Sequence, residues 1–185
     1  LAETVATAAR EAFAGRGGPA FLDIPMDVLM QQVDEADVAW PAHYRVDNRP
    51  AADPDTLGRI RSALAAAERP VIFAGCGLVG GETALQSVAE ALGAPVYLNA
   101  RARGSLPPGH PLLGVNARGD AFRRADLVLA LGVDWDFRAG YGRRIDPGAT
   151  VIHVDRDASR IGWNRPVPIG AVADPAVLLS QIGRA

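Results

Sequence analysis

The sequence predicts an α/β fold, a doubly wound parallel sheet of about five to six strands with helices on both faces. Segments with apolar residues at helical spacing alternate with short runs that are strongly apolar, such as Val71–Ala74 and Asp126–Leu131. A strand that is buried on both faces is apolar throughout, and such strands belong to parallel sheets covered by helices. Glycine-rich turns follow several of these runs, as expected where a strand passes into a helix.

The individual elements follow from local signals. A helix is expected to start at Asp53-Pro54, because aspartate followed by proline is typical of a helix N-terminus. The next helix carries Leu85 and Leu92 on its apolar face and is expected to end at Gly93. Strands are expected at Val71–Ala74, Val96–Leu98, Asp126–Leu131 and Val151–Val154, and within Val167–Val172. Two more helices are expected, at Ala121–Arg124 and from Asp174-Pro175 to Ile182. Residues 99–120 and 132–148 are expected to form loops.

The amino-terminal part has a different pattern. Apolar residues at helical spacing predict a helix that stops at Gly15, and Ala20–Ile24 predicts a short strand between two prolines. A lone helix and strand cannot form a domain, so residues 1–33 are interpreted as the C-terminal tail of a preceding domain. Residues 34–52 are polar and lack periodicity, which predicts a linker to a domain over residues 53–185.

Composition and charge exclude several classes of protein. The chain has 185 residues, of which 49% are hydrophobic and 22% charged, a globular composition. Its formal net charge of −2 argues against a general binder of nucleic acid or of anionic membranes. No apolar run approaches the roughly 20 residues that span a bilayer, and no secretory signal is apparent.

The absence of lysine is informative. All 19 basic residues are arginine, which excludes a lysine-containing phosphate loop and a Schiff-base lysine within this chain. The single cysteine, Cys76, can form neither an internal disulfide nor a cysteine-based zinc site, so we expect a reducing, cytoplasmic environment. Because the sequence begins with Leu1 and not with methionine, we also expect it to be a piece of a larger protein.

A candidate ligand site lies at the carboxyl ends of the predicted strands, where open α/β sheets bind ligands. The run from Gly75 to Gly80 has the spacing G-x-G-x-x-G, which indicates either a dinucleotide cradle or a tight strand-to-helix turn. The second strand ends in Asn99 and not in an acidic residue, which disfavours standard NAD binding. Arg101 and Arg103 follow it and either grip a phosphate or are solvated.

Two carboxylates complete this edge. Asp155 ends a strand and either accepts hydrogen bonds from a ribose or caps the next turn. Asp174 precedes Pro175, where helix capping is the stronger interpretation. The histidines are widely separated and lack metal-binding spacing, so we predict neither a metal site nor a catalytic residue in this chain.

A series of segments resembles thiamine-diphosphate-dependent enzymes, in order and over nearly the whole chain, and acetolactate-synthase-like enzymes are the most similar subgroup. The run Gly18–Val28 resembles the segment that closes their pyrimidine-binding domain. The segments that resemble their central domain are Arg69–Gly77, Ala102–Pro107, Ala125–Gly132, Val151–Asp155 and Ile161–Pro166.

The resemblance implies a parent enzyme with three similar α/β domains that uses thiamine diphosphate and magnesium. Catalysis in this family takes place between the first and third domains, usually across a dimer interface. The glutamate of the first domain and the Gly-Asp-Gly motif of the third are missing here, so this part is expected to be inactive by itself. Its implied partners are the missing pyrimidine- and diphosphate-binding domains of one polypeptide, assembled as a homodimer or homotetramer.

The central domain is the accessory module of the family, and it binds FAD, an ADP-like group or nothing. The positions that the resemblance places against such a cofactor are Gly75, Gly77, Asn99, Arg103, Gly132, Arg138, Asp155 and Asp174. The chain departs from the acetolactate-synthase pattern at Cys76, at Arg103, where lysine is common, and at Asp134, which replaces an arginine. The alternative hypothesis is a stand-alone FAD-binding or nucleotide-binding module like that of electron-transfer flavoproteins.

Overall fold

The computed structural model describes residues 1–45 and 47–183, and it divides the chain into two compact units. The first unit comprises residues 1–48 and the second residues 49–185. The linker predicted over residues 34–52 contains the boundary between them. Each unit is described by itself below.

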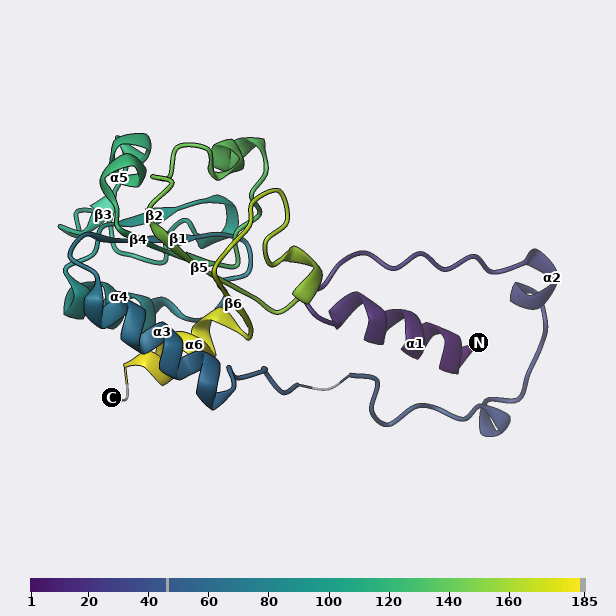
Figure 1. The fold of residues 1–185 in the computed structure, drawn as a ribbon. Helices are drawn as coiled ribbons and strands as arrows, with labels where there is room; N and C mark the ends of the chain where they lie inside the picture. Colours follow the sequence, from purple (N-terminus) through teal and green to yellow (C-terminus); the bar gives the residue numbers. More distant parts are fainter. Residues whose placement is uncertain (46, 184–185) are drawn as a thin grey trace. The chain divides into compact units, whose positions relative to one another are not determined.

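The second unit is built on a parallel sheet of six strands, as the apolar runs predict (Figure 1). The strand order is β3-β2-β1-β4-β5-β6, so the chain starts in the middle of the sheet and moves outward first to one edge and then to the other. This is the order of a Rossmann-type doubly wound sheet. The strands are β1 (Pro70–Ala74), β2 (Val96–Leu98), β3 (Leu113–Gly114), β4 (Leu127–Leu131), β5 (Thr150–Asp155) and β6 (Ile169–Val172).

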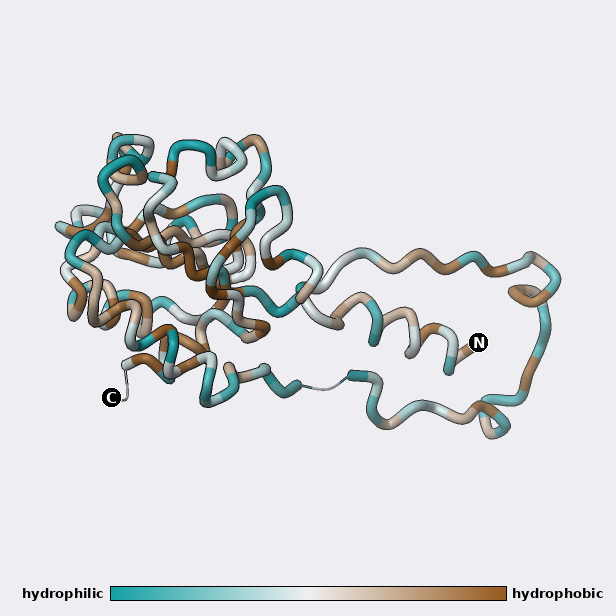
Figure 2. The backbone as a smooth tube through the Cα atoms, viewed as in Figure 1, coloured by the Kyte–Doolittle hydropathy of each residue, from teal (hydrophilic) through white to brown (hydrophobic). Residues whose placement is uncertain are grey.

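Helices cover the two faces of the sheet unequally (Figure 1). The helices α3 (Pro54–Ala66), α4 (Glu82–Leu92) and α6 (Pro175–Ile182) cover one face. The other face carries the short helix α5 (Arg118–Arg124) and the loop that follows β4. The hydrophobic colouring of the central strands in Figure 2 matches this double coverage.

Alternation along the strands produces two separate cores. Ile72 and Leu129 point into the core beneath α3, α4 and α6, and Phe73 and Val128 point into the core beneath α5. Successive side chains of a strand point to opposite faces, so strands that are apolar throughout supply both cores. This explains why these strands show no polar alternation in the sequence.

The helix boundaries follow the predicted signals. The Asp53 side chain accepts a hydrogen bond from the Thr56 backbone N–H at 2.9 Å and caps α3. Gly93 ends α4 with a φ of +58°, a left-handed conformation that glycine adopts without a steric cost. The structure adds the strand β3 within the predicted loop 99–120, and α5 begins at Arg118, earlier than expected.

The first unit contains α1 (Ala2–Phe13), α2 (Met26–Leu29) and a single 3-10 turn at Glu35–Asp37. The predicted strand Ala20–Ile24 is wrong for this structure, which leaves the segment irregular and the Phe21 side chain 91% exposed. The physical reason is that a strand needs a hydrogen-bonded neighbour, and the described part of residues 1–48 offers none. Among the residues that the structure describes, no helix combines the length and apolar character needed to cross a bilayer.

A buried carboxylate joins the beginning of the second unit to its last helix. Asp174 is fully buried, and its Oδ1 accepts hydrogen bonds from the N–H groups of Ala176 and Val177 at 2.9 and 3.2 Å, which cap α6. Its Oδ2 accepts from Arg49 Nε at 2.7 Å and forms a second ion pair with Arg156. The Asp174 N–H also donates to the Pro50 carbonyl at 2.8 Å. Capping, which the sequence favoured for Asp174, is confirmed.

Replacing Asp174 should therefore distinguish the stability that comes from its ion pairs from the stability that comes from its capping of α6. D174A should lower the free energy of unfolding by about 3 kcal/mol, because it leaves a buried ion pair without its carboxylate. D174N keeps a side chain that can cap α6, so its free energy of unfolding should fall by about 1 kcal/mol less than that of D174A.

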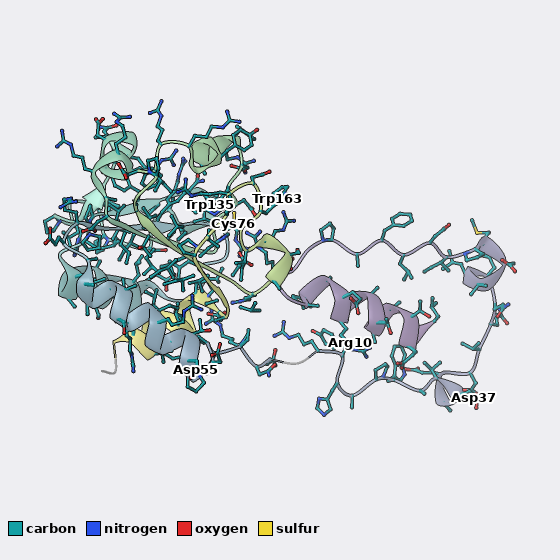
Figure 3. The ribbon with its side chains drawn as sticks, in the orientation of Figure 1. Arg10, Asp37, Asp55, Cys76, Trp135 and Trp163 are labelled. Carbon is teal, nitrogen blue, oxygen red and sulfur yellow. The ribbon has the colours of Figure 1, made fainter. Side chains whose placement is uncertain are left out.

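Chemical denaturation followed by circular dichroism measures both variants. The control is D55N on the exposed first turn of α3 (Figure 3), which should stay within about 0.5 kcal/mol of the wild type. Equal stability of D174A and D55N would show that the Asp174 contacts contribute nothing.

Candidate functional site

The carboxyl edge of the sheet is organised by a close contact between two loops. Gly75 N–H donates to the Leu131 carbonyl, and Gly77 N–H donates to the Gly132 carbonyl, both at 2.9 Å. A Cβ on Gly77 would lie 2.6 Å from Gly132 Cα, and one on Gly132 would lie 2.3 Å from Gly77 Cα. No real Cβ tolerates such distances, so both positions require glycine for backbone packing.

This contact lies where the strand order reverses, between β1 and β4. Two N–H groups of the G-x-G turn are engaged with the loop after β4, and Leu78 N–H closes a turn on the Gly75 carbonyl at 3.1 Å. The geometry therefore matches the tight-turn interpretation of the glycine pattern. Contact of Gly75, Gly77 and Gly132 with a dinucleotide stays a prediction.

Substituting Gly132 tests how strongly the edge depends on this contact. In G132A the new Cβ would clash with the Gly77 backbone, and alanine would have to adopt a φ of +59°, which is unfavourable for residues with a Cβ. G132A should therefore destabilise the chain by about 3 kcal/mol. G58A is the matched control, because Gly58 lies within α3 and its added Cβ would meet no atom within 4 Å. This control should stabilise the chain by about 0.5 kcal/mol. Thermal and urea unfolding measure both, and a G132A variant as stable as G58A would contradict the proposed packing.

The carboxylate at the end of β5 is engaged in local structure. Asp155 is 1% exposed, and its Oδ1 accepts a hydrogen bond from Asp157 N–H at 3.0 Å. The Asp155 carbonyl accepts from Ala173 N–H at 2.9 Å. These contacts match the turn-capping interpretation of Asp155. Ribose binding by Asp155, and cofactor contact by Asp174, stay predictions.

Three of the other predicted site residues come together around a cavity of about 650 Å³. Asn99 and Arg103 follow β2, and Arg138 belongs to the 3-10 segment Phe137–Gly142 after β4. The cavity is also lined by α5 and by the residues just after β3, so it lies on the face of the sheet that α5 covers. The predicted site residues thus fall into an internally packed group at β1, β4, β5 and α6 and a cavity-lining group near β2.

Sequence reasoning missed the other charged residues of this cavity. Arg118, Arg123 and Arg144 line it together with the acidic residue Asp120. They were missed because they belong to different expected elements. Arg118 and Asp120 were expected in the loop 99–120, and Arg144 in the loop 132–148, so only the fold brings them together with Arg123. The clustering of arginines around α5, in a chain of net charge −2, is the signal that could have found them.

The electrostatics of the cavity are perturbed by burial. Desolvation, together with the nearby positive charge of Arg144, lowers the pKa of Arg118 from its ordinary value. Burial, with a smaller contribution from the Asp120 carboxylate, raises the pKa of Tyr97, which also lines the cavity. The phenol of Tyr97 is therefore protonated at neutral pH and can act as a hydrogen-bond donor.

The aspartate that replaces an arginine of the acetolactate-synthase pattern does not line the cavity. The Asp134 carboxylate lies 3.8 Å from the Arg160 guanidinium, at ion-pair distance. The next carboxylate, Asp136, accepts a hydrogen bond from Arg138 N–H at 2.8 Å and pairs with the Arg138 guanidinium at 3.0 Å. The two carboxylates thus pair with arginines within the loop after β4 and the turn after β5.

A buried histidine joins the loops behind this edge. His153 Nδ1 accepts hydrogen bonds from the Trp135 indole N–H at 3.3 Å and from the Gly162 N–H at 3.2 Å. His153 Nε2 lies 3.0 Å from the Val133 carbonyl, to which it can only donate. Since two donors face Nδ1 and an acceptor faces Nε2, the geometry assigns the neutral Nε2–H tautomer. The sequence-based interpretation of His153 as a packing residue agrees with its full burial.

The tautomer of His153 is directly measurable. The ¹⁵N chemical shifts of its ring at neutral pH should show a protonated Nε2 and an unprotonated Nδ1. Exposed His43 is the internal comparison, because its ring is not held in one tautomer by burial. A protonated Nδ1 in His153 would mean that the hydrogen bonds from Trp135 and Gly162 are not formed.

Within residues 1–45 and 47–183, no group of three or more histidine, cysteine, aspartate or glutamate side chains is arranged to hold a metal ion. Cys76 is partly buried beside the glycine contact. The site is thus an arginine-rich cavity beside a closed glycine turn.

Comparison with known proteins gives the family. Residues 57–182 match the family model described as "Thiamine pyrophosphate enzyme, central domain". The chain is 33% identical over 196 residues to an acetolactate synthase of Mycobacterium bovis, covering 98% of this chain and 31% of the relative. It is 31% identical over 190 residues to the large subunit of acetolactate synthase isozyme 1 of Escherichia coli, covering 98% of this chain and 34% of that subunit.

Solved structures show the same fold. A thiamin diphosphate-dependent enzyme from Mycobacterium smegmatis matches with a TM-score of 0.77 at 24% identity, covering 98% of this chain and 36% of the other. The benzoylformate decarboxylase of Polynucleobacter necessarius matches with a TM-score of 0.72 at 24% identity, covering 99% of this chain and 35% of that enzyme. The chain spans about a third of the length of the curated relatives it matches. The family model matches residues 57–182, which contain all six strands of the sheet. This chain therefore belongs to the thiamine pyrophosphate enzymes and contains their central domain.

Proposed function

We propose that this chain is the central, non-catalytic domain of a thiamine-diphosphate-dependent 2-oxoacid decarboxylase or carboligase that resembles acetolactate synthase. The observation that carries the proposal is the match over 98% of the chain to acetolactate synthases at 31% and 33% identity. Thiamine diphosphate and magnesium would be bound by the other domains of the same polypeptide. The role of this domain would be to space those catalytic domains and to bind a nucleotide.

The exposed apolar surface of the first unit supports the proposed domain organisation. Within residues 1–48, a groove of about 660 Å³ is lined by apolar side chains that include Val5, Val33 and Trp40. Phe21 and Met30 are also strongly exposed. A soluble domain seldom leaves so much apolar surface uncovered, so this surface is suited to packing against another part of a protein. We therefore interpret residues 1–33 as the tail of the preceding pyrimidine-binding domain, which would cover it.

The nucleotide proposed for this domain is FAD or an ADP-like group. Asn99, Arg103 and Arg138 line one cavity, where they could hold the phosphate and polar groups of such a ligand. Asp174 has no exposed surface, and both of its carboxylate oxygens are engaged. We expect such a nucleotide to be held first at the cavity, and its contact with the other expected positions stays a prediction.

The activity is tested on the complete polypeptide that contains this chain. With thiamine diphosphate and magnesium, it should release CO₂ from a 2-oxoacid such as pyruvate, and omission of thiamine diphosphate should abolish the release. The 185-residue chain assayed under the same conditions should be inactive, because the catalytic domains are absent. Turnover by the short chain, or no thiamine-dependent turnover of any 2-oxoacid by the complete polypeptide, would contradict the proposal.

A further inference from the structure

The segment through which the chain enters the second unit is anchored to the last helix. Residues 49–52, here called the strap, precede the Asp53 cap of α3. The Ala52 N–H donates to Gln181 Oε1 at 3.1 Å, and Gln181 Nε2 donates to the Ala52 carbonyl at 3.2 Å. Ala52 is also buried in the core beneath α3, α4 and α6. The end of the strap beside α3 is therefore fixed to the scaffold.

At the other end of the strap, one side chain reaches the loop that follows the glycine turn. Arg49 Nε donates to Asp174 Oδ2 at 2.7 Å, and Arg49 Nη2 donates to the Val79 carbonyl at 2.5 Å. Val79 belongs to the loop 78–81, which leads from the glycine turn into α4. A single guanidinium thus bridges the first residue of the second unit, the start of α6 and the loop before α4.

The loop 78–81 is well packed at its two ends and open in its middle. Leu78 is buried, and a Cβ on Gly81 would lie 2.6 Å from the Ala176 Cβ, so both ends of the loop touch the scaffold. Val79 and Gly80 between them are exposed. A cavity of about 250 Å³, lined by Arg49, Gly80 and residues of α6, leaves space beside the guanidinium. The Arg49 hydrogen bond therefore restrains the part of the loop that packing leaves free.

Asp174 can lose Arg49 without becoming an unpaired buried charge. Its Oδ1 accepts hydrogen bonds from two N–H groups of α6, and its Oδ2 forms a second ion pair with Arg156, which directly follows β5. A buried carboxylate that keeps a cation and two donors avoids the large cost of an uncompensated charge. Arg49 is also the more exposed of the two arginines, with 36% of its side chain exposed against 26% for Arg156. The contacts therefore allow Arg49 to leave while α6 stays capped.

We propose that the strap couples the entry of the chain to the mobility of the loop 78–81, with Arg49 as the releasable contact. While Arg49 is seated on Asp174, the loop is held. When a displacement of the preceding chain unseats Arg49, the loop becomes mobile, and the sheet and α6 keep their structure. Such coupling is reciprocal, so a loop that is held in place also favours the seated strap. The inference does not depend on the proposed enzymatic activity, because it concerns contacts within the second unit.

Backbone order parameters from ¹⁵N relaxation of the 185-residue chain test the coupling. In the wild type, the amides of Val79 and Gly80 should have values near about 0.85, which is typical of rigid backbone. In R49Q these values, together with that of residue 49 itself, should fall below about 0.6. The amides of Ala176 and Val177 should stay rigid, because Arg156 still pairs with Asp174. Order parameters report motion within the folded state, so a lower global stability alone would not produce this pattern.

R49K provides a second variant in case R49Q fails to fold. A lysine keeps the charge that faces Asp174, but its compact ammonium lacks the planar fork that bridges Asp174 and the Val79 carbonyl, so the loop should again become mobile.

Two variants are the controls. R59Q removes another arginine-to-carbonyl hydrogen bond of the second unit, from Arg59 Nη2 to the Pro168 carbonyl at 3.1 Å, and should leave Val79 and Gly80 rigid. Q181A removes the two hydrogen bonds to Ala52 and should loosen Ala52 only. Rigid Val79 and Gly80 in R49Q and R49K would overturn the proposal. An equal loss of order at Ala176 and Val177, or in R59Q, would also overturn it.

Discussion

The closeness of two glycine backbones determines the shape of the functional edge of this domain. Gly77 and Gly132 pack so tightly that neither position accepts a Cβ, and their hydrogen bond extends the pairing of β1 and β4 beyond the ends of the strands. This closes the place where the sheet reverses its strand order. The loop after β4 continues from this contact onto the face that α5 covers, where it contributes to the core and to the cavity lining. A cavity forms there, and its lining is made of side chains.

The carboxylates and the arginines at this edge of the sheet differ in burial, and this difference explains their different contacts. Asp155 and Asp174 are almost completely buried and bind backbone N–H groups or arginines of the same unit. Their contribution is to hold the ends of β5 and the start of α6. The arginines around α5 lie closer to the surface and line the cavity. Buried carboxylates thus stabilise the scaffold, whereas the partly exposed cations have N–H donors that face solvent.

Much of the fold could be predicted from the sequence, because apolar runs and helix caps such as Asp53 and Asp174 are local signals. The edge strand β3 was missed because two residues are too short to show periodicity. The strand at Ala20–Ile24 was wrong because its apolar pattern reports burial against a partner that the described part of residues 1–48 lacks. The arginine cavity was only partly predicted, because Arg118 and Arg144 are far from Arg103 in sequence and meet through the fold.

We propose that ligand recognition in this domain belongs to the arginine cavity and not to the glycine turn. Mapping amide chemical shifts during a titration with pyrophosphate tests it most directly, since each backbone N–H reports its own position. We expect the largest shifts at residues 114–120 and 137–144, with residues 75–81 nearly unchanged. The largest shifts at residues 75–81, accompanied by loss of the Gly77 hydrogen bond, would contradict the account.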